Sequence, residues 1–204
     1  TISEHLSWLS SLKSRYDLKV HPFPLRKMTD WRVLAGEISR EDGKYFKVVG
    51  VKVTISNREV SSWCQPLIQP MQQGICAFII KKINGVYHFM VQAKLECGNF
   101  DVMELAPTVQ CLTGNIPSSR SARPPFLDSS GSQVLYDTLQ SEEGGRFYHE
   151  QNRNMLVEVD DSFPLELPER YRWMTLGQIY QFLRFNNYLN IQSRSLIAAL
   201  NYLS

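Results

Sequence analysis

The chain has 204 residues, of which 43% are hydrophobic and 21% charged, and this is enough to bury one full hydrophobic core. Its 22 basic and 20 acidic side chains leave a net charge of +2, which is too small to favour a nucleic-acid partner. No apolar run approaches the roughly 20 residues that cross a bilayer, and the start lacks the pattern of a signal peptide, so no membrane partner is expected. The four cysteines form no CxxC pair, which favours reduced thiols and a cytoplasmic location.

The first predicted element is an amphipathic helix within residues 1–20, because Ile2, Leu6, Leu9 and Leu12 recur at helical spacing. A sheet-rich core over residues 30–160 follows, and we expect most of its strands to be antiparallel. The Asn84-Gly85 pair between two apolar runs predicts a tight hairpin. The expected strands cover residues 46–55, 75–83, 86–97, 104–112 and 154–159.

Residues 113–132 change to Ser, Pro, Arg and Gly without an apolar period, which is typical of a long binding loop. Residues 134–141 are compatible with either a short helix or a strand. The spacing of Thr175 and Gln178 predicts a capping box at the start of C-terminal helices over residues 174–204. This order of elements predicts an α+β fold in a single domain over residues 1–204.

The predicted strand over residues 86–97 carries an unusual row of polar side chains. Read at a period of two, one face holds His88, Met90, Gln92, Lys94 and Glu96. A second polar group, with another acid and another histidine, follows at residues 140–149. Each residue alone has a structural alternative, either a satisfied histidine or a simple ion pair. Together they indicate a site for proton transfer, because burying several ionisable groups costs stability.

Several familiar chemistries are not supported. The sequence has no GxSxG, GxxxxGK[ST], GxGxxG or HExxH motif. Its four histidines lie in no close Cys/His spacing, so we expect no metal site.

Six motifs, spread from about residue 31 to residue 194, together resemble the NDP-hexose 2,3-dehydratase family. The resemblance covers most of the chain. The motifs, in order, are Trp63-Cys64-Gln65-Pro66, Gln92-Ala93-Lys94 with Glu96 and Gly98-Asn99, Pro107-Thr108-Val109-Gln110, Gln140-Ser141-Glu142, Asn152-Arg153-Asn154-Met155 and Thr175-Leu176-Gly177-Gln178.

The resemblance implies a Nudix-like fold, in which a mixed sheet lies between helices. Members of the family are similar to two copies of such a unit in one polypeptide, and this chain contains one copy. A homodimer about a twofold axis is therefore expected to restore the pair. The carboxylate-rich signature of Nudix hydrolases is absent, so the fold implies no pyrophosphatase activity.

The reaction that the resemblance implies is loss of water across C2 and C3 of a dTDP-linked 4-keto-6-deoxyhexose, which gives a 3,4-diketo-2,6-dideoxy sugar. No cofactor is expected, because the C4 ketone already acidifies the C3 proton. The protein must supply a base, a donor to the enolate oxygen and an acid for the leaving C2 hydroxyl. The alternative is a non-catalytic nucleotide-sugar-binding unit, or one half of a hetero-assembly.

The candidate catalytic residues are Glu96 or His88 as the base, Lys94 as the cation at the enolate oxygen, and Glu142 or His149 as the acid. The remaining candidates would bind the substrate through its hydroxyls, its diphosphate or its nucleobase. They are Gln65, Gln92, Asn99, Gln110 and Asn154 for the hydroxyls, Arg153, Arg146 and Arg120 for the diphosphate, and Trp63 or Tyr148 for stacking on the nucleobase.

Overall fold

The computed structural model describes residues 1–113 and 131–200, so most of the predicted loop at 113–132 lies outside the described residues. Its helices are α1 (Ile2–Arg15), the 3₁₀ turn η1 (Leu25–Lys27), α2 (Leu176–Phe182) and α3 (Ile191–Ala198). Its strands are β1 (Trp31–Leu34), β2 (Glu37–Arg40), β3 (Phe46–Thr54), β4 (Ser62–Pro70), β5 (Gly74–Ile83), β6 (Val86–Leu95), β7 (Met103–Ala106), β8 (Val109–Leu112), β9 (Ser132–Ser141), β10 (Gln151–Val159) and β11 (Tyr171–Thr175).

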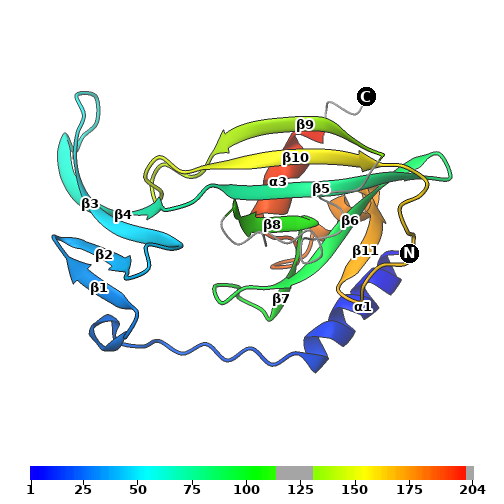
Figure 1. The fold of residues 1–204 in the computed structure, drawn as a ribbon, viewed down its shortest axis with the longest axis horizontal. Helices are drawn as coiled ribbons and strands as arrows, with labels where there is room; N and C mark the ends of the chain where they lie inside the picture. The colour runs from blue at the N-terminus through cyan, green and yellow to red at the C-terminus, as the bar shows by residue number, and fades with distance from the viewer. Residues whose placement is uncertain (114–130, 201–204) are drawn as a thin grey trace.

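The strands form two sheets that stand beside each other (Figure 1). The smaller sheet is an antiparallel meander in the order β1-β2-β3-β4. The larger sheet has the order β11-β6-β5-β10-β9, with β7 added to β6 and β8 added to β5. Its β10 runs parallel to β5, while the other pairs are antiparallel. The expected α+β class, with a mixed sheet flanked by helices, is confirmed.

Local signals placed several elements correctly. Asn84 and Gly85 have positive φ angles of 50° and 79° and join β5 to β6 in a tight hairpin. Thr175 and Gln178 form the predicted capping box at the start of α2. The first helix ends at Arg15, inside the predicted range, and residues 132–141 form a strand rather than a helix. No described helix combines the length and apolar character that crossing a bilayer requires.

The larger sheet is buried on both faces. One face packs on α1, α2 and α3 through side chains that include Phe78 and Phe89, whose rings meet edge to face. The other face carries a second cluster with Ile79, Met90 and Val109, against which Phe163 packs. Met90 is only 1% exposed, so the expected continuous polar row along β6 is wrong at this position, because the segment after β10 covers the sheet there.

Thr108 separates β5 from β6 in the middle of the larger sheet. Its Oγ1 accepts a hydrogen bond from the Ile79 N–H at 2.9 Å and donates one to the Met90 carbonyl. Ile79 and Met90 are the last residues that pair directly between β5 and β6; beyond them β6 pairs with β7 and β5 with β8. The predicted strand over 104–112 is therefore two strands, interrupted at Pro107 and Thr108 because proline cannot donate to the ladder.

Replacing Thr108 by valine is expected to lower the free energy of unfolding by about 1–3 kcal/mol, because it leaves a buried N–H and a buried carbonyl without their partner. Thr108 is 2% exposed, so water cannot readily replace the hydroxyl. Denaturant unfolding measures the change. The matched control is Thr54→Val at an exposed strand end, where a change below about 0.5 kcal/mol is expected. Equal effects of the two variants would contradict the role given to the Thr108 hydroxyl.

Candidate active site

A cavity of about 370 Å³ opens where β5 and β6 diverge. Segments far apart in the sequence meet there. The polar and thiol side chains of the lining are Cys76 from β5, Lys94 and Glu96 at the end of β6, Gln110 and Cys111 from β8, Glu150 and Asn152 at the start of β10, and Gln192 from α3. Different strands thus contribute a cation, carboxyls, amides and thiols to one cavity.

One wall of the cavity holds Lys94, Glu96 and Gln110 in a single network. The Lys94 Nζ lies 3.3 Å from Glu96 Oε1 and donates to the Gln110 carbonyl oxygen at 2.9 Å. The Gln110 Nε2 donates to the same Glu96 oxygen at 2.9 Å. Both charged side chains are partly buried, with 22% and 35% of their side-chain surfaces exposed. The Glu96 carboxylate is therefore held in one orientation at the cavity wall.

The start of α3 fixes the amide of Gln110. Asn190 is the N-cap of this helix, and its Oδ1 accepts from the Ser193 N–H at 2.9 Å. Its Nδ2 donates to Gln110 Oε1 at 2.7 Å, which leaves the Gln110 Nε2 directed at Glu96. Asn190 is 4% exposed, so this link between helix and site is shielded from water.

The opposite wall comes from the hairpin between β9 and β10. The Asn152 Nδ2 donates to Glu142 Oε1 at 2.6 Å, and Asn152 is buried. Asn152 lies beside Gly74 in the parallel pairing of β10 with β5. A Cβ at position 74 would lie 1.9 Å from Asn152 Oδ1, so only glycine leaves room for this amide. Glu150 lines the cavity from the same wall.

The two thiols at the cavity stay protonated at neutral pH. Burial, together with the negative charge of Glu142, raises the pKa of Cys76 to about 12. Burial also raises the pKa of Cys111. All four cysteines carry free thiols, as expected from the sequence, with Cys64 and Cys97 exposed.

Neither histidine proposed for catalysis lies in this cavity. His88 is six residues from Lys94 along β6, about 20 Å away in an extended strand, and its Nδ1 lies 2.9 Å from the Val86 carbonyl oxygen. His149 is exposed and stacks on Tyr148, with 4.1 Å between the ring centres. The structure therefore brings together the carboxyl candidates, Glu96 and Glu142, and separates them from His88.

The arginines proposed for the diphosphate are not in the cavity. Arg153 alternates with the buried Asn152 along β10 and is exposed, with its Nε 2.7 Å from Asp137 Oδ1. This pair holds the pKa of Asp137 below its usual range. Arg146 is exposed and lies 3.2 Å from Glu143, and Arg120 lies outside the described residues.

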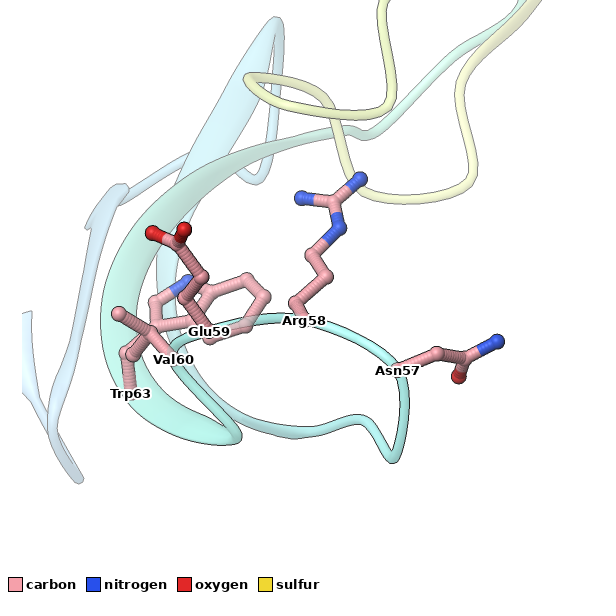
Figure 2. Close-up of a pocket in the computed structure, with 5 residues that line it drawn as sticks. All are labelled: Asn57, Arg58, Glu59, Val60 and Trp63. Atoms are coloured by element: carbon pink, nitrogen blue, oxygen red, sulfur yellow. The ribbon is translucent and has the colours of Figure 1, made fainter.

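Trp63 and Gln65 lie on β4, away from the cavity. The Trp63 Nε1 donates to Gln65 Oε1 at 2.7 Å, and the Gln65 Nε2 donates to the Gly145 carbonyl at 2.9 Å. Trp63 lines a second pocket, of about 690 Å³, formed with the loop at residues 57–60. Figure 2 shows the indole beside this loop, with the Arg58 side chain extending from it. The bond from Gln65 to Gly145 joins this part of β4 to the turn between β9 and β10.

The remaining candidates, Asn154, Gln92 and Asn99, do not line the cavity. Asn154 is buried, and its Nδ2 donates to the Asn152 carbonyl at 3.0 Å, so it supports the wall. Gln92 lies farther along β6, between β7 and β11. Asn99 has a buried Nδ2 with no hydrogen-bond partner in the part of the chain that the structure describes.

Sequence reasoning missed Glu150, Asn152, Cys76, Cys111 and Gln192 as cavity residues. The sequence held a signal for Glu150 and for Asn152. Pairing β9 with β10 as a hairpin, with Ser141 opposite Gln151, places Glu150 next to Glu142. Asn152 lies in a motif that was recognised but received no role. Within residues 1–113 and 131–200, no group of three or more His, Cys, Asp or Glu side chains is arranged to hold a metal ion. The expectation of a site without metal stays a prediction.

The fold and the cavity define an α+β protein with a polar pocket lined by a lysine, carboxyls and amides. The sequence profile of the NDP-hexose 2,3-dehydratase family matches residues 2–200. The chain therefore belongs to the NDP-hexose 2,3-dehydratase family.

Two curated relatives carry the name dTDP-4-dehydro-6-deoxy-alpha-D-glucopyranose 2,3-dehydratase. The one from Saccharopolyspora spinosa is 45% identical over 208 residues, which cover 100% of this chain and 43% of the relative. The one from Streptomyces violaceoruber is 43% identical over 204 residues, which cover 97% of this chain and 46% of the relative. The chain thus spans less than half the length of these relatives.

Among solved structures, an ADP compounds hydrolase is 14% identical, covers 87% of this chain and 95% of its own, and gives a TM-score of 0.49. A Nudix hydrolase from M. smegmatis, RenU, is 11% identical, covers 75% of this chain and 94% of its own, and gives 0.45. These neighbours bring no hydrolase chemistry to this chain, because fold alone does not carry function.

Proposed function

We propose that this chain catalyses the loss of water across C2 and C3 of a dTDP-linked 4-keto-6-deoxyhexose. The observation that supports the proposal is the meeting of Lys94, Glu96, Gln110 and Asn152 around one cavity, with Glu142 bonded to the Asn152 amide. A cavity of about 370 Å³ can take a sugar ring. The names of the two curated relatives support the same substrate class.

We assign the chemical tasks to residues on the two walls of the cavity. Glu96, held by Gln110, removes the C3 proton, which the neighbouring C4 ketone has made acidic. The Lys94 ammonium stabilises the charge that develops on the C4 oxygen. An acid on the opposite wall, where Glu142 lies, protonates the leaving C2 hydroxyl. The C2–O bond breaks, water leaves, and the resulting enol tautomerises to the 3,4-diketo-2,6-dideoxy sugar.

The reaction is proposed to need no cofactor. The substrate loses a proton from C3 and a hydroxide from C2, so no external electron donor or acceptor is required. The ketone at C4 accepts the electron pair of the broken C–H bond and returns it when the C2–O bond breaks. Acid–base groups and one cation are sufficient for these steps.

The turn between β9 and β10 offers a path for the nucleotide. It begins at Glu142 beside the cavity and contacts β4, where the Ile68 N–H donates to the Arg146 carbonyl at 2.8 Å. We propose that the diphosphate follows this turn toward Arg146, with Arg120 as a second cation, and that Tyr148 or Trp63 stacks on the base. Arg153 remains a weaker candidate, since its guanidinium is already paired with Asp137.

Incubation with dTDP-4-keto-6-deoxyglucose tests the activity, with mass spectrometry to detect the loss of one water from the sugar. Turnover by the purified chain supports the proposal. Binding of the substrate without turnover would instead select the alternative of a nucleotide-sugar-binding unit or one half of a hetero-assembly. If the chain shows neither binding nor turnover, the result contradicts both the dehydratase and the binding-unit functions.

A homodimer is also proposed, and the smaller sheet supports it. Val33 and Leu34 on β1 are 77% and 73% exposed, and an apolar groove of about 590 Å³ runs between η1 and β1 to β3. Sheets that leave such apolar surface open usually mark a protein–protein contact. Sedimentation at micromolar concentration checks this, and a monomer at that concentration would contradict the homodimer.

We also propose a cytoplasmic location, because the free thiols favour a reducing compartment.

A further inference from the structure

Glu150 is a carboxyl of the cavity to which the sequence motifs assign no role. It lies just before β10, while Glu142 lies just after β9, so the two residues face each other where the turn of this hairpin begins and ends. The Glu142 N–H donates to the Glu150 carbonyl at 3.0 Å, which fixes the two backbones side by side. Glu150 lines the cavity beside Asn152, and Glu142 bonds to the Asn152 amide, so both carboxyls lie at the end of the cavity that β9 and β10 form.

The two carboxyls differ in their bonding. Glu142 Oε1 accepts a hydrogen bond from the buried Asn152 amide at 2.6 Å. In the part of the chain that the structure describes, no side chain donates to the carboxyl of Glu150, which lines the cavity. Glu142 is thus occupied as an acceptor and held against the protein, while Glu150 is free to contact a ligand.

The electrostatic setting of Glu150 favours its protonated form over the charged form. Burial raises the pKa of Glu150, and the adjacent Glu142 charge raises it further. Two neighbouring carboxyls resist carrying negative charge at the same time, so one of them holds a proton to a higher pH. Lys94 lies on the opposite wall with Glu96, so it does not pair with Glu150.

We propose that Glu150 is the general acid of the elimination and that Glu142 is its positioning partner, an inference that rests on the proposed function. The C2–O bond breaks with its electron pair on oxygen, and this oxygen takes the proton from the Glu150 carboxyl and leaves as water. The electron pair of the enolate forms the C2=C3 double bond. Glu96 then releases the C3 proton to solvent, and Glu150 takes up a proton from solvent. Both groups return to their starting states.

The test separates proton removal from water loss by running the reaction in deuterated water. In Glu150→Gln, water loss is expected to fall at least about 100-fold, the scale of general acid catalysis. The same variant is expected to go on exchanging the C3 hydrogen of recovered substrate for deuterium, which NMR detects, because Glu96 is intact. Glu166→Gln, at an exposed position outside both the cavity and this turn, is the matched control and should keep wild-type rates.

The outcomes distinguish the inference from the proposed function. Wild-type protein that shows neither C3 exchange nor water loss overturns the proposed function. If wild-type protein is active and Glu150→Gln matches it, Glu150 is not the acid. If Glu150→Gln folds but loses exchange together with water loss, its role lies in proton removal or in substrate binding, and the inference is equally overturned. Thermal unfolding of each variant confirms that the fold is kept.

Discussion

Replacing Glu96 by glutamine is expected to lower turnover at least about 100-fold, equivalent to about 2.7 kcal/mol of activation free energy. Glutamine keeps the size of the side chain and can still bond to Gln110, but it cannot take a proton from C3. Lys94 loses its charged partner, which lies 3.3 Å away in the wild-type protein. Rates of water loss and of C3 deuterium exchange should fall together, because both begin with removal of the same proton.

Two comparisons make this result specific. Glu166→Gln removes one negative charge from an exposed position outside the site and should leave the rate unchanged. Glu142→Gln, on the opposite wall, should lower water loss more than it lowers C3 exchange. A Glu96→Gln variant that folds and stays within about tenfold of wild-type turnover, about 1.4 kcal/mol, would show that another residue is the base.

Replacing Gly74 by alanine is expected to destabilise the protein by about 1–3 kcal/mol and to lower turnover at least about tenfold. The added Cβ would lie 1.9 Å from Asn152 Oδ1 and 2.9 Å from its Cγ, so the buried amide has to move. Its bond to Glu142 is 2.6 Å long and is lost with that movement. Denaturant unfolding and the water-loss assay measure the two effects.

Gly50→Ala is the matched control, because Gly50 lies inside strand β3 and a Cβ there would meet no atom within 4 Å. This variant should keep both stability and turnover near the wild-type values. If Gly74→Ala shows the same small changes, the close approach of Gly74 and Asn152 is not what holds the wall of the cavity.

Local sequence signals predicted the elements whose geometry depends on near neighbours. The Asn84-Gly85 turn requires two positive φ angles, which this residue pair adopts readily. The capping box needs only Thr175 and Gln178 in one turn of helix. Period-two reading also placed Phe89 and Val91 in the core, but it failed at Met90, because the chain after β10 covers the second face of the sheet.

The sequence by itself determined the class of fold, the family motifs and the catalytic candidates Lys94, Glu96 and Glu142. Only the tertiary structure decided which candidates meet. Thr108 ends the direct pairing of β5 with β6, and the space this opens collects Glu96 and Glu150 on opposite walls. Because His88 lies six residues along the strand from Lys94, it is carried away from that space. Distances between strands that pair across the fold depend on packing of remote segments, which no local pattern encodes.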